Sequence, residues 1–244
     1  MSASTPAPNG VRVSDLLQTA ARLFRATLLK CLPMGMIAVL CASLPNIYWN
    51  ATGHTVSLFG PYDTNFRVLS VIGVAIALWV FGAMMLRQRA VVLGAPILLG
   101  AELQASLRRL PVVLLSTALA NLSVSLGLLL LLVPGLYLLV CYLVLLPVVL
   151  FEGAGPVAAL LRSVQIMRRL WWPAVAALVI AVLLSFIGAL VFAAVLAVAA
   201  EIFASNGAAM QAFVHAGVVG FYGLFSVYLS ALQLVLHSAA SSSA

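Results

Sequence analysis

The chain has 244 residues, of which 65% are hydrophobic and 7% are charged, whereas about 25% of the residues in an average soluble domain are charged. A soluble core cannot bury this many apolar side chains, so the composition excludes a soluble globular protein and indicates a membrane protein. The net charge of +7 comes from basic residues that flank apolar stretches, which is a pattern of membrane topology, and we expect no nucleic-acid partner.

Six stretches are apolar and long enough to cross a bilayer, because about 30 Å of hydrocarbon at 1.5 Å of rise per residue requires roughly 20 residues. They are residues 31–49, 68–86, 112–133, 135–151, 173–200 and 212–236. Together they predict an all-α polytopic membrane domain over residues 13–237. The ends of the chain, residues 1–12 and 238–244, are rich in small and polar residues and are predicted to be disordered tails.

Three basic segments each run into a proline and then into an apolar stretch. The basic residues are Arg22, Arg25 and Lys30 before Pro33, Arg108 and Arg109 before Pro111, and Arg168 and Arg169 before Pro173. Each segment is predicted to be an amphipathic helix in the headgroup layer, where anionic lipid attracts each Lys or Arg by about 1 kcal/mol. The layout predicts a pseudo-threefold repeat of an interfacial helix followed by a spanning hairpin, with anionic headgroups at the cytoplasmic face as lipid partners.

Residues spaced three or four positions apart define the faces of these interfacial helices. The first has an apolar face of Leu16, Leu17, Ala20, Leu23, Phe24, Thr27 and Leu28. The second places Leu99, Leu103, Leu107 and Leu110 opposite Glu102, Ser106 and Arg109. The third, over residues 156–171, places Leu160, Val164, Met167 and Trp171 opposite Arg162, Gln165 and Arg169.

The basic residues also predict the orientation of the chain. With a cytoplasmic N-terminus, 11 of the 12 Lys and Arg residues lie inside and only Arg67 lies outside. This bias predicts six crossings with both termini in the cytoplasm. A cleaved signal peptide is not expected, because about 30 residues precede the first apolar stretch. Cys31, Cys41 and Cys141 lie in or beside predicted spans and are expected to be small core residues.

The fourth predicted span is the shortest, with 17 residues directly after Pro134. It either crosses the bilayer fully or re-enters it, and a re-entrant segment requires neighbouring helices to cover its backbone groups. Pro147 removes one helical hydrogen bond and clashes with the carbonyl of Leu143, so a kink is predicted near Leu143.

No Asp, Glu, Lys or Arg residue falls inside the six predicted spans, which argues against a pump that uses a carboxylate at mid-membrane depth. Two polar stripes remain. The sixth span carries Tyr222, Ser226, Ser230, Gln233 and His237, and the third carries Thr117, Asn121 and Ser125. One interpretation makes Asn121, Ser125, Tyr222, Ser226 and Gln233 the walls of a polar cavity. The other makes the stripes interhelical hydrogen bonds worth roughly 0.6 kcal/mol each, and Gly217, Gly220 and Gly223 favour this close packing.

Signatures of enzymes and of metal or cofactor sites are weak in this chain. His54, His215 and His237 lack the spacing of metal ligands, and neither a nucleophile elbow nor a phosphate-binding loop is present. We therefore expect no catalytic residue, no cofactor and no metal. Glu152 has no visible partner as a catalytic acid and is predicted to pair with a basic residue of the following helix, such as Arg162.

Residues 134–172 resemble the signature of the YciC-like bacterial inner-membrane proteins and of the membrane domain fused to some glycerophosphodiester phosphodiesterases. The resemblance rests on Pro134, Gly135, Pro147, Glu152, Arg162, Ser163, Arg168 and Trp171. Two positions depart from the family pattern, since Cys141 stands where members often carry Arg, and Arg169 where they carry Gly. The resemblance implies a multi-pass protein of the bacterial inner membrane, and it implies no phosphodiesterase activity because that domain is absent from this sequence.

The leading hypothesis is a non-enzymatic inner-membrane protein that acts as a scaffold or accessory factor at the cytoplasmic leaflet, with the three basic helices as its contact surface. The main alternative is a transporter of a small solute or lipid, with a cavity between the third and sixth spans. A membrane-embedded lipid enzyme is the third hypothesis.

Overall fold

The computed structural model describes residues 12–53, 62–96, 98–202 and 207–241. All regular secondary structure in these ranges is helical. The helices are α1 (Val13–Ala51), α2 (Thr64–Leu93), α3 (Leu99–Leu130), α4 (Leu132–Cys141), α5 (Leu145–Pro147), α6 (Pro156–Met167), α7 (Trp171–Ile202) and α8 (Gly207–Ser241). Residues 1–11 of the predicted N-terminal tail and His54 lie outside the described residues, as does the side chain of His215.

Six segments of the described chain are apolar and long enough to cross a membrane, which confirms the predicted all-α, six-span class. They are Val13–Ala51, Thr64–Leu93, Leu99–Leu130, Leu132–Glu152, Trp171–Val195 and Ala216–Ser241. The fourth has 21 residues, so a full crossing is available to it. The last segment continues through residues 238–241, which the sequence assigned to a disordered tail.

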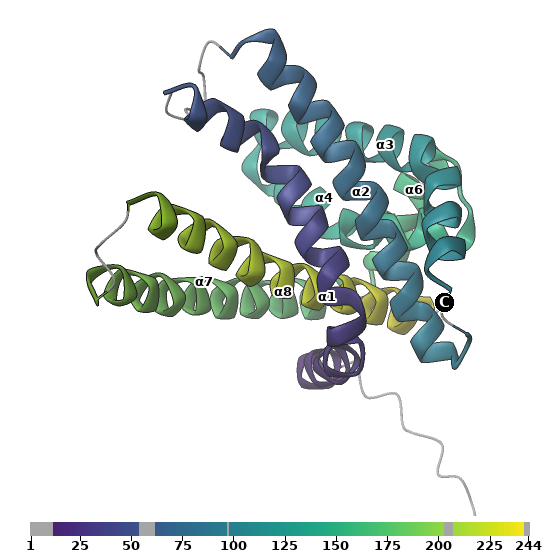
Figure 1. Cartoon of the computed structure of the whole chain (residues 1–244). Helices are drawn as coiled ribbons and strands as arrows, with labels where there is room; N and C mark the ends of the chain where they lie inside the picture. The colour runs from purple at the N-terminus through teal and green to yellow at the C-terminus, as the bar shows by residue number, and fades with distance from the viewer. Residues whose placement is uncertain (1–11, 54–61, 97, 203–206, 242–244) are drawn as a thin grey trace, which may run out of the picture.

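The three predicted interfacial segments join their spans in different ways. The first two are continuous with the helices that follow, because Pro33 lies inside α1 and Pro111 inside α3. Figure 1 shows α1 sharply bent, with its first part viewed end on and the remainder running across the picture. A proline inside a helix removes one hydrogen bond and permits such a bend. The third segment is a separate helix, α6, with Pro156 in its first turn.

The turn between the third and fourth spans lies at Leu131, whereas the predicted spans leave Pro134 between them. Leu131 is extended, with φ −156° and ψ 133°, and α4 begins at the next residue. Pro134 therefore sits in the first turn of α4, where its missing N–H is not needed by the helix. Pro134 and Gly135 are thus the third and fourth residues of α4.

The fourth span departs from a regular α-helix close to Leu143, as Pro147 predicts. A 3₁₀ turn covers Tyr142–Val144, with φ −95° and ψ 12° at Val144, and a π-helical segment covers Val148–Glu152. Because Pro147 cannot donate to the carbonyl four residues earlier, the ladder of helical hydrogen bonds breaks there. A break of this kind is tolerated at membrane depth where protein surrounds it.

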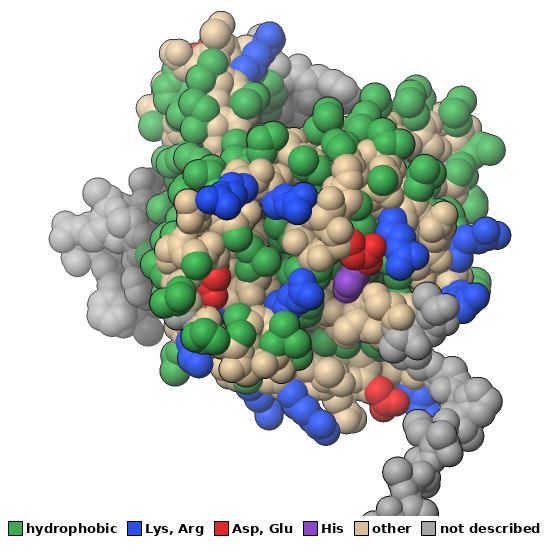
Figure 2. All heavy atoms as spheres, turned by 90° about the vertical axis from the view of Figure 1, so that its right-hand side faces the viewer, with side chains coloured by type: hydrophobic (Ala, Val, Ile, Leu, Met, Phe, Trp, Pro, Cys, Tyr) green, Lys and Arg blue, Asp and Glu red, His purple; other side chains and the backbone are tan. Residues whose placement is uncertain are grey.

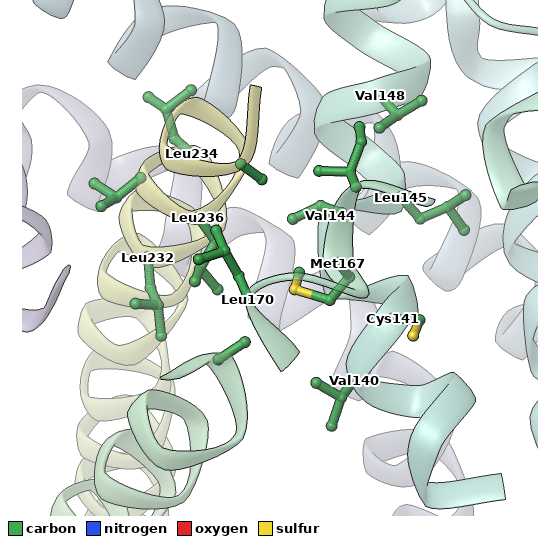
Figure 3. Packing of buried hydrophobic residues seen from close by; sticks show 14 of the residues in the cluster. Val140, Cys141, Val144, Leu145, Val148, Met167, Leu170, Leu232, Leu234 and Leu236 are labelled. Atoms are coloured by element: carbon green, nitrogen blue, oxygen red, sulfur yellow. The ribbon is translucent and has the colours of Figure 1, made fainter. Parts of the chain in front are cut away.

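The largest buried cluster surrounds this break (Figure 3). Val144, Val148 and Met167 are fully buried there, and they pack with Leu232 and Leu236 of α8. The cluster joins the fourth span to α6, to the start of α7 and to the end of α8. The broken helix is therefore covered by protein on the side that faces the bundle.

Helices α1 and α8 pack closely through glycine. A Cβ atom built on Gly35 of α1 would lie 2.7 Å from the carbonyl oxygen of Gly223 and 2.7 Å from Ser226 Oγ, both of α8. Small residues at such crossings let two backbones approach within van der Waals contact. Beyond the crossing, the α7–α8 hairpin and the α1–α2 pair diverge, as Figure 1 shows.

Replacing Gly35 with alanine is expected to separate α1 from α8 and to lower the free energy of unfolding by about 1–3 kcal/mol, the usual cost of overpacking. The measurement is unfolding of the purified protein in mixed micelles with increasing dodecyl sulfate. Gly100→Ala is the matched control, because no atom lies within 4 Å of a Cβ there. Equal stability of the two variants would contradict the close crossing.

Candidate functional site

Charged side chains from five separate segments meet at one end of the helical bundle. We call this region the basic end and define it by Arg87, Arg89, Glu102, Arg109, Glu152, Arg162 and His237. The contacts below join α2, α3, the Glu152 segment, α6 and α8 at this end. Figure 2, which looks onto this side of the molecule, shows Lys and Arg side chains spread among hydrophobic ones.

A buried ion pair links α2 and α3. Arg87 Nε lies 2.9 Å from Glu102 Oε2, and the two side chains are 10% and 9% exposed. The other side of the guanidinium donates from Nη1 to the carbonyl oxygen of Lys30 in α1, at 2.9 Å. One arginine thus joins three helices, and the pair lies inside the bundle although the sequence placed both residues in flanking, solvent-facing segments.

The helix geometry explains why the sequence missed this pair. Helix α2 continues past the predicted span end at residue 86 to Leu93, so Arg87 falls within the packed part of the helix. Gly94, with φ +64°, ends α2 in the left-handed conformation, and α3 starts five residues later. Arg87 and Glu102 lie at similar distances on either side of this turn. Opposite charges placed in this way are the sequence signal that could have predicted the ion pair.

The second predicted interfacial helix presents its polar face to the protein rather than to water. Ser106 Oγ donates to the Trp79 carbonyl at 2.7 Å, and Trp79 Nε1 donates to the Leu103 carbonyl at 2.8 Å. Leu99 and Leu107 on the other face are 52% and 49% exposed. The start of α3 is therefore a helix of the bundle in which Leu99 and Leu107 point outward, while Glu102 and Ser106 are engaged with α2.

In the first predicted interfacial helix, the apolar face is buried by the protein itself. Leu16, Ala20 and Leu23 belong to the main core cluster, while Arg22 and Arg25 are exposed. This face therefore packs onto other helices instead of entering the lipid. The exposed arginines remain available to headgroups or to a partner.

Glu152 connects two further elements. Its Oε2 lies 3.0 Å from Arg162 Nε of α6, which confirms the predicted pairing, and its Oε1 lies 3.0 Å from His237 Nε2 of α8. Arg109 of α3 donates to the adjacent Gly153 carbonyl at 3.3 Å. Both carboxylate oxygens of Glu152 are therefore engaged in contacts between elements, which is a structural role.

The residues of the family-like signature fall into two places. Gly135 is buried at the opposite end of the bundle, where a Cβ on Gly127 would lie 2.9 Å from its Cα. Around the core, Pro147 is buried and Ser163 Oγ donates to the Leu160 carbonyl at 2.8 Å. Trp171 stacks on Tyr137 at 5.8 Å between ring centroids, and Arg168 is exposed. The signature thus marks packing between the fourth span and α6 and α7.

The structure does not bring the two polar stripes together. Asn121 and Ser125 are exposed on α3, which packs on α2, α4 and α6, whereas α8 packs on α1, α2 and α7. Ser226 Oγ donates to the Gly223 carbonyl within α8, at 2.8 Å, and Gln233 Oε1 is buried without a hydrogen-bond partner in the described chain. The prediction of a cavity between the third and sixth spans is therefore wrong.

A cavity containing Tyr222 does exist, but it lies between α1 and α8. It has a volume of about 490 Å³, and its polar lining comes from Ser43, Asn46, Asn50 and Tyr222. Of the residues predicted to line a polar cavity, Tyr222 alone is part of this lining. The divergence of α1 and α8 beyond the Gly35 crossing opens this space.

Comparisons of the chain with models of protein families, with curated proteins and with solved structures give no match. The resemblance to the YciC-like proteins therefore stays a prediction from the sequence.

Neutralising Glu102 is expected to destabilise the protein far more than neutralising Glu152. Glu102→Gln leaves Arg87 buried without a counter-ion, which costs about 3–5 kcal/mol. Glu152→Gln loses pairs that are partly solvated, for which about 0.2–1 kcal/mol is typical. Dodecyl sulfate unfolding of both variants in mixed micelles measures the difference, and a larger loss for Glu152→Gln would contradict the assigned burial.

Proposed function

We propose that this chain is a non-enzymatic, multi-pass protein of the bacterial inner membrane, of the YciC-like type, that acts as a scaffold or accessory factor at the cytoplasmic leaflet. The observation that carries the proposal is the basic end. Its acidic groups Glu102 and Glu152 are engaged by Arg87, Arg162 and His237 within the protein. Glu102 and Glu152 are thereby neutralised internally, and the exposed arginines of this surface outnumber its exposed acidic residue, Asp15 of α1.

The exposed basic residues come from three elements. Arg22 and Arg25 lie on α1, Arg108 lies on α3, and Arg168 follows α6. An anionic leaflet attracts each such charge by about 1 kcal/mol, and the same charges favour a cytoplasmic location for this end. The termini of α1 and α8 at this end would then both face the cytoplasm.

The opposite end of the α1–α2 pair suits the other surface of the membrane. Trp49, Tyr62 and Phe66 pack together there, and the Tyr62 and Phe66 rings are stacked with their centroids 4.1 Å apart. Tyr48 donates its hydroxyl to Asp63 at 3.0 Å, and Asp63 caps α2 by accepting from the Phe66 N–H. Aromatic side chains with polar tips are enriched at membrane–water boundaries.

A cysteine at Thr64 is expected to react with an impermeant thiol reagent added to intact cells, whereas a cysteine at Arg168 should react only after the membrane is opened. Both positions are exposed in the structure, so burial does not decide their labelling. A reporter fused after Ala244 should be cytoplasmic. The reverse labelling pattern would overturn the proposed orientation.

The transporter alternative keeps one specific observation in its favour, the 490 Å³ cavity between α1 and α8. Its lining includes the polar side chains of Asn46, Asn50 and Tyr222, and cavities of about 300–1,000 Å³ are the usual size for small-molecule sites. A transporter would require these groups for its substrate, whereas a scaffold would not.

Two sets of substitutions at matched expression separate these hypotheses. Changing Arg25, Arg108 and Arg168 to glutamine should reduce the preference for phosphatidylglycerol over phosphatidylcholine in the lipid shell by about 1 kcal/mol per charge, measured with spin-labelled lipids. The scaffold hypothesis expects this variant to reproduce the phenotype of a deletion strain, and Asn46→Ala/Tyr222→Phe to behave as wild type. The opposite ordering would favour the transporter.

A further inference from the structure

A second cavity lies at the basic end, between the first half of α1, the end of α2 and the end of α8. Its volume is about 440 Å³. The floor is apolar and well buried, since Leu23, Leu234 and Val235 are each 8% exposed. At the mouth, Val92 and Leu93 of α2 are 61% and 67% exposed, so the cavity opens on the outer surface of the bundle.

One cationic side chain in the wall of this cavity has no carboxylate to neutralise it. The Arg89 guanidinium lies over the Phe151 ring, 4.4 Å from its centroid, which holds the charge against the wall. Among the described residues, the three ion pairs engage Arg87, Arg162 and His237, and Arg89 has no acidic group within salt-bridge distance. A half-buried charge in this position attracts an anion.

The other polar side chains of the wall are Thr19, His237, Ser238 and Ser241, none of which carries a negative charge. His237 also lines the cavity, and the edge of its ring contacts Phe151, 5.8 Å between centroids. The carboxylate behind it, Glu152, is held by Arg162 as well as by His237. The negative charge of Glu152 is therefore balanced by its own partners, and Arg89 gives the wall of the cavity a positive charge.

We propose that this cavity binds one anionic glycerophospholipid, with the headgroup phosphate on Arg89 and an acyl chain on the floor of Leu23, Leu234 and Val235. An apolar floor beside one uncompensated cation matches an amphiphile with a negative head. Basic pockets between helices at the cytoplasmic side are a recognised kind of site for acidic headgroups. The proposal rests on the proposed function in one respect, that the basic end faces the anionic leaflet.

The test measures binding of dioctanoyl phosphatidylglycerol to the full-length protein in a neutral detergent, by thermophoresis. Arg89→Gln is expected to weaken binding about tenfold, the effect of one charge-assisted hydrogen bond. The control Arg67→Gln removes an exposed charge at the other end of α2, away from the cavity lining, and should leave binding unchanged. Wild-type affinity in Arg89→Gln would overturn the proposal.

A second pair of variants decides the result if Arg89→Gln does not fold. Val92→Trp narrows the mouth, and Val157→Trp on α6 is its matched control, since both valines are 61% exposed. The first should weaken phosphatidylglycerol binding and the second should not, whereas an equal effect of the two would contradict the assigned cavity.

Two further ligands distinguish binding of an anionic lipid from binding of a neutral lipid or of a soluble phosphate ester. Dioctanoyl phosphatidylcholine is expected to bind more weakly than phosphatidylglycerol, because its headgroup has no net charge, and glycerol 3-phosphate should fail to compete because it has no acyl chain. Competition by glycerol 3-phosphate at similar concentrations would replace the lipid with a soluble phosphate ester and overturn the proposal. This assay is made in detergent solution, so a failure to bind phosphatidylglycerol would contradict the cavity proposal without contradicting the proposed orientation or surface charge. Reversed cysteine labelling, in turn, would contradict the orientation without changing the binding result.

Discussion

The ion pair between Arg87 and Glu102 is the interaction on which the basic end depends. Each group is about nine-tenths buried, and Arg87 also reaches the carbonyl of Lys30. In a low-dielectric interior, either charge alone would be strongly unfavourable. Helices α1, α2 and α3 must therefore keep fixed positions relative to one another for the pair to form. Ser106 and Trp79 reinforce the same contact between α2 and α3 through two further hydrogen bonds.

The same constraint accounts for the division of roles among the charged residues. Glu102 and Glu152 engage Arg87, Arg162 and His237, and these contacts fasten helices to one another. Exposed arginines on α1, on α3 and after α6 are left to determine how the surface meets lipid or a partner. Arg89 differs from both groups, since it is half-buried beside an apolar cavity and packs on the Phe151 ring.

Much of the fold follows from the sequence because span length and hydropathy are local properties, and the break near Leu143 follows from Pro147 alone. The pair of Glu152 with Arg162 is also predictable from the sequence, since the two residues lie on either side of one short turn. The direction in which a helix face points depends on the neighbouring helices, which the sequence does not reveal. For this reason the sequence predicts a solvent-facing Glu102 and a cavity-lining Asn121, whereas Glu102 is buried and Asn121 is exposed. The contact of His237 with Glu152, and the cavity between α1 and α8, depend on helices far apart in the chain.

A double-mutant cycle on Arg87 and Glu102 is the measurement that tests this account most directly. Unfolding free energies are compared for wild type, Arg87→Gln, Glu102→Gln and the double variant in the same mixed micelles. If the charges form a buried pair, the double variant should be more stable than the sum of the single losses implies, with a coupling of about 1–3 kcal/mol. Additive losses would show that the two charges do not interact, and would contradict the buried pair that holds the basic end together.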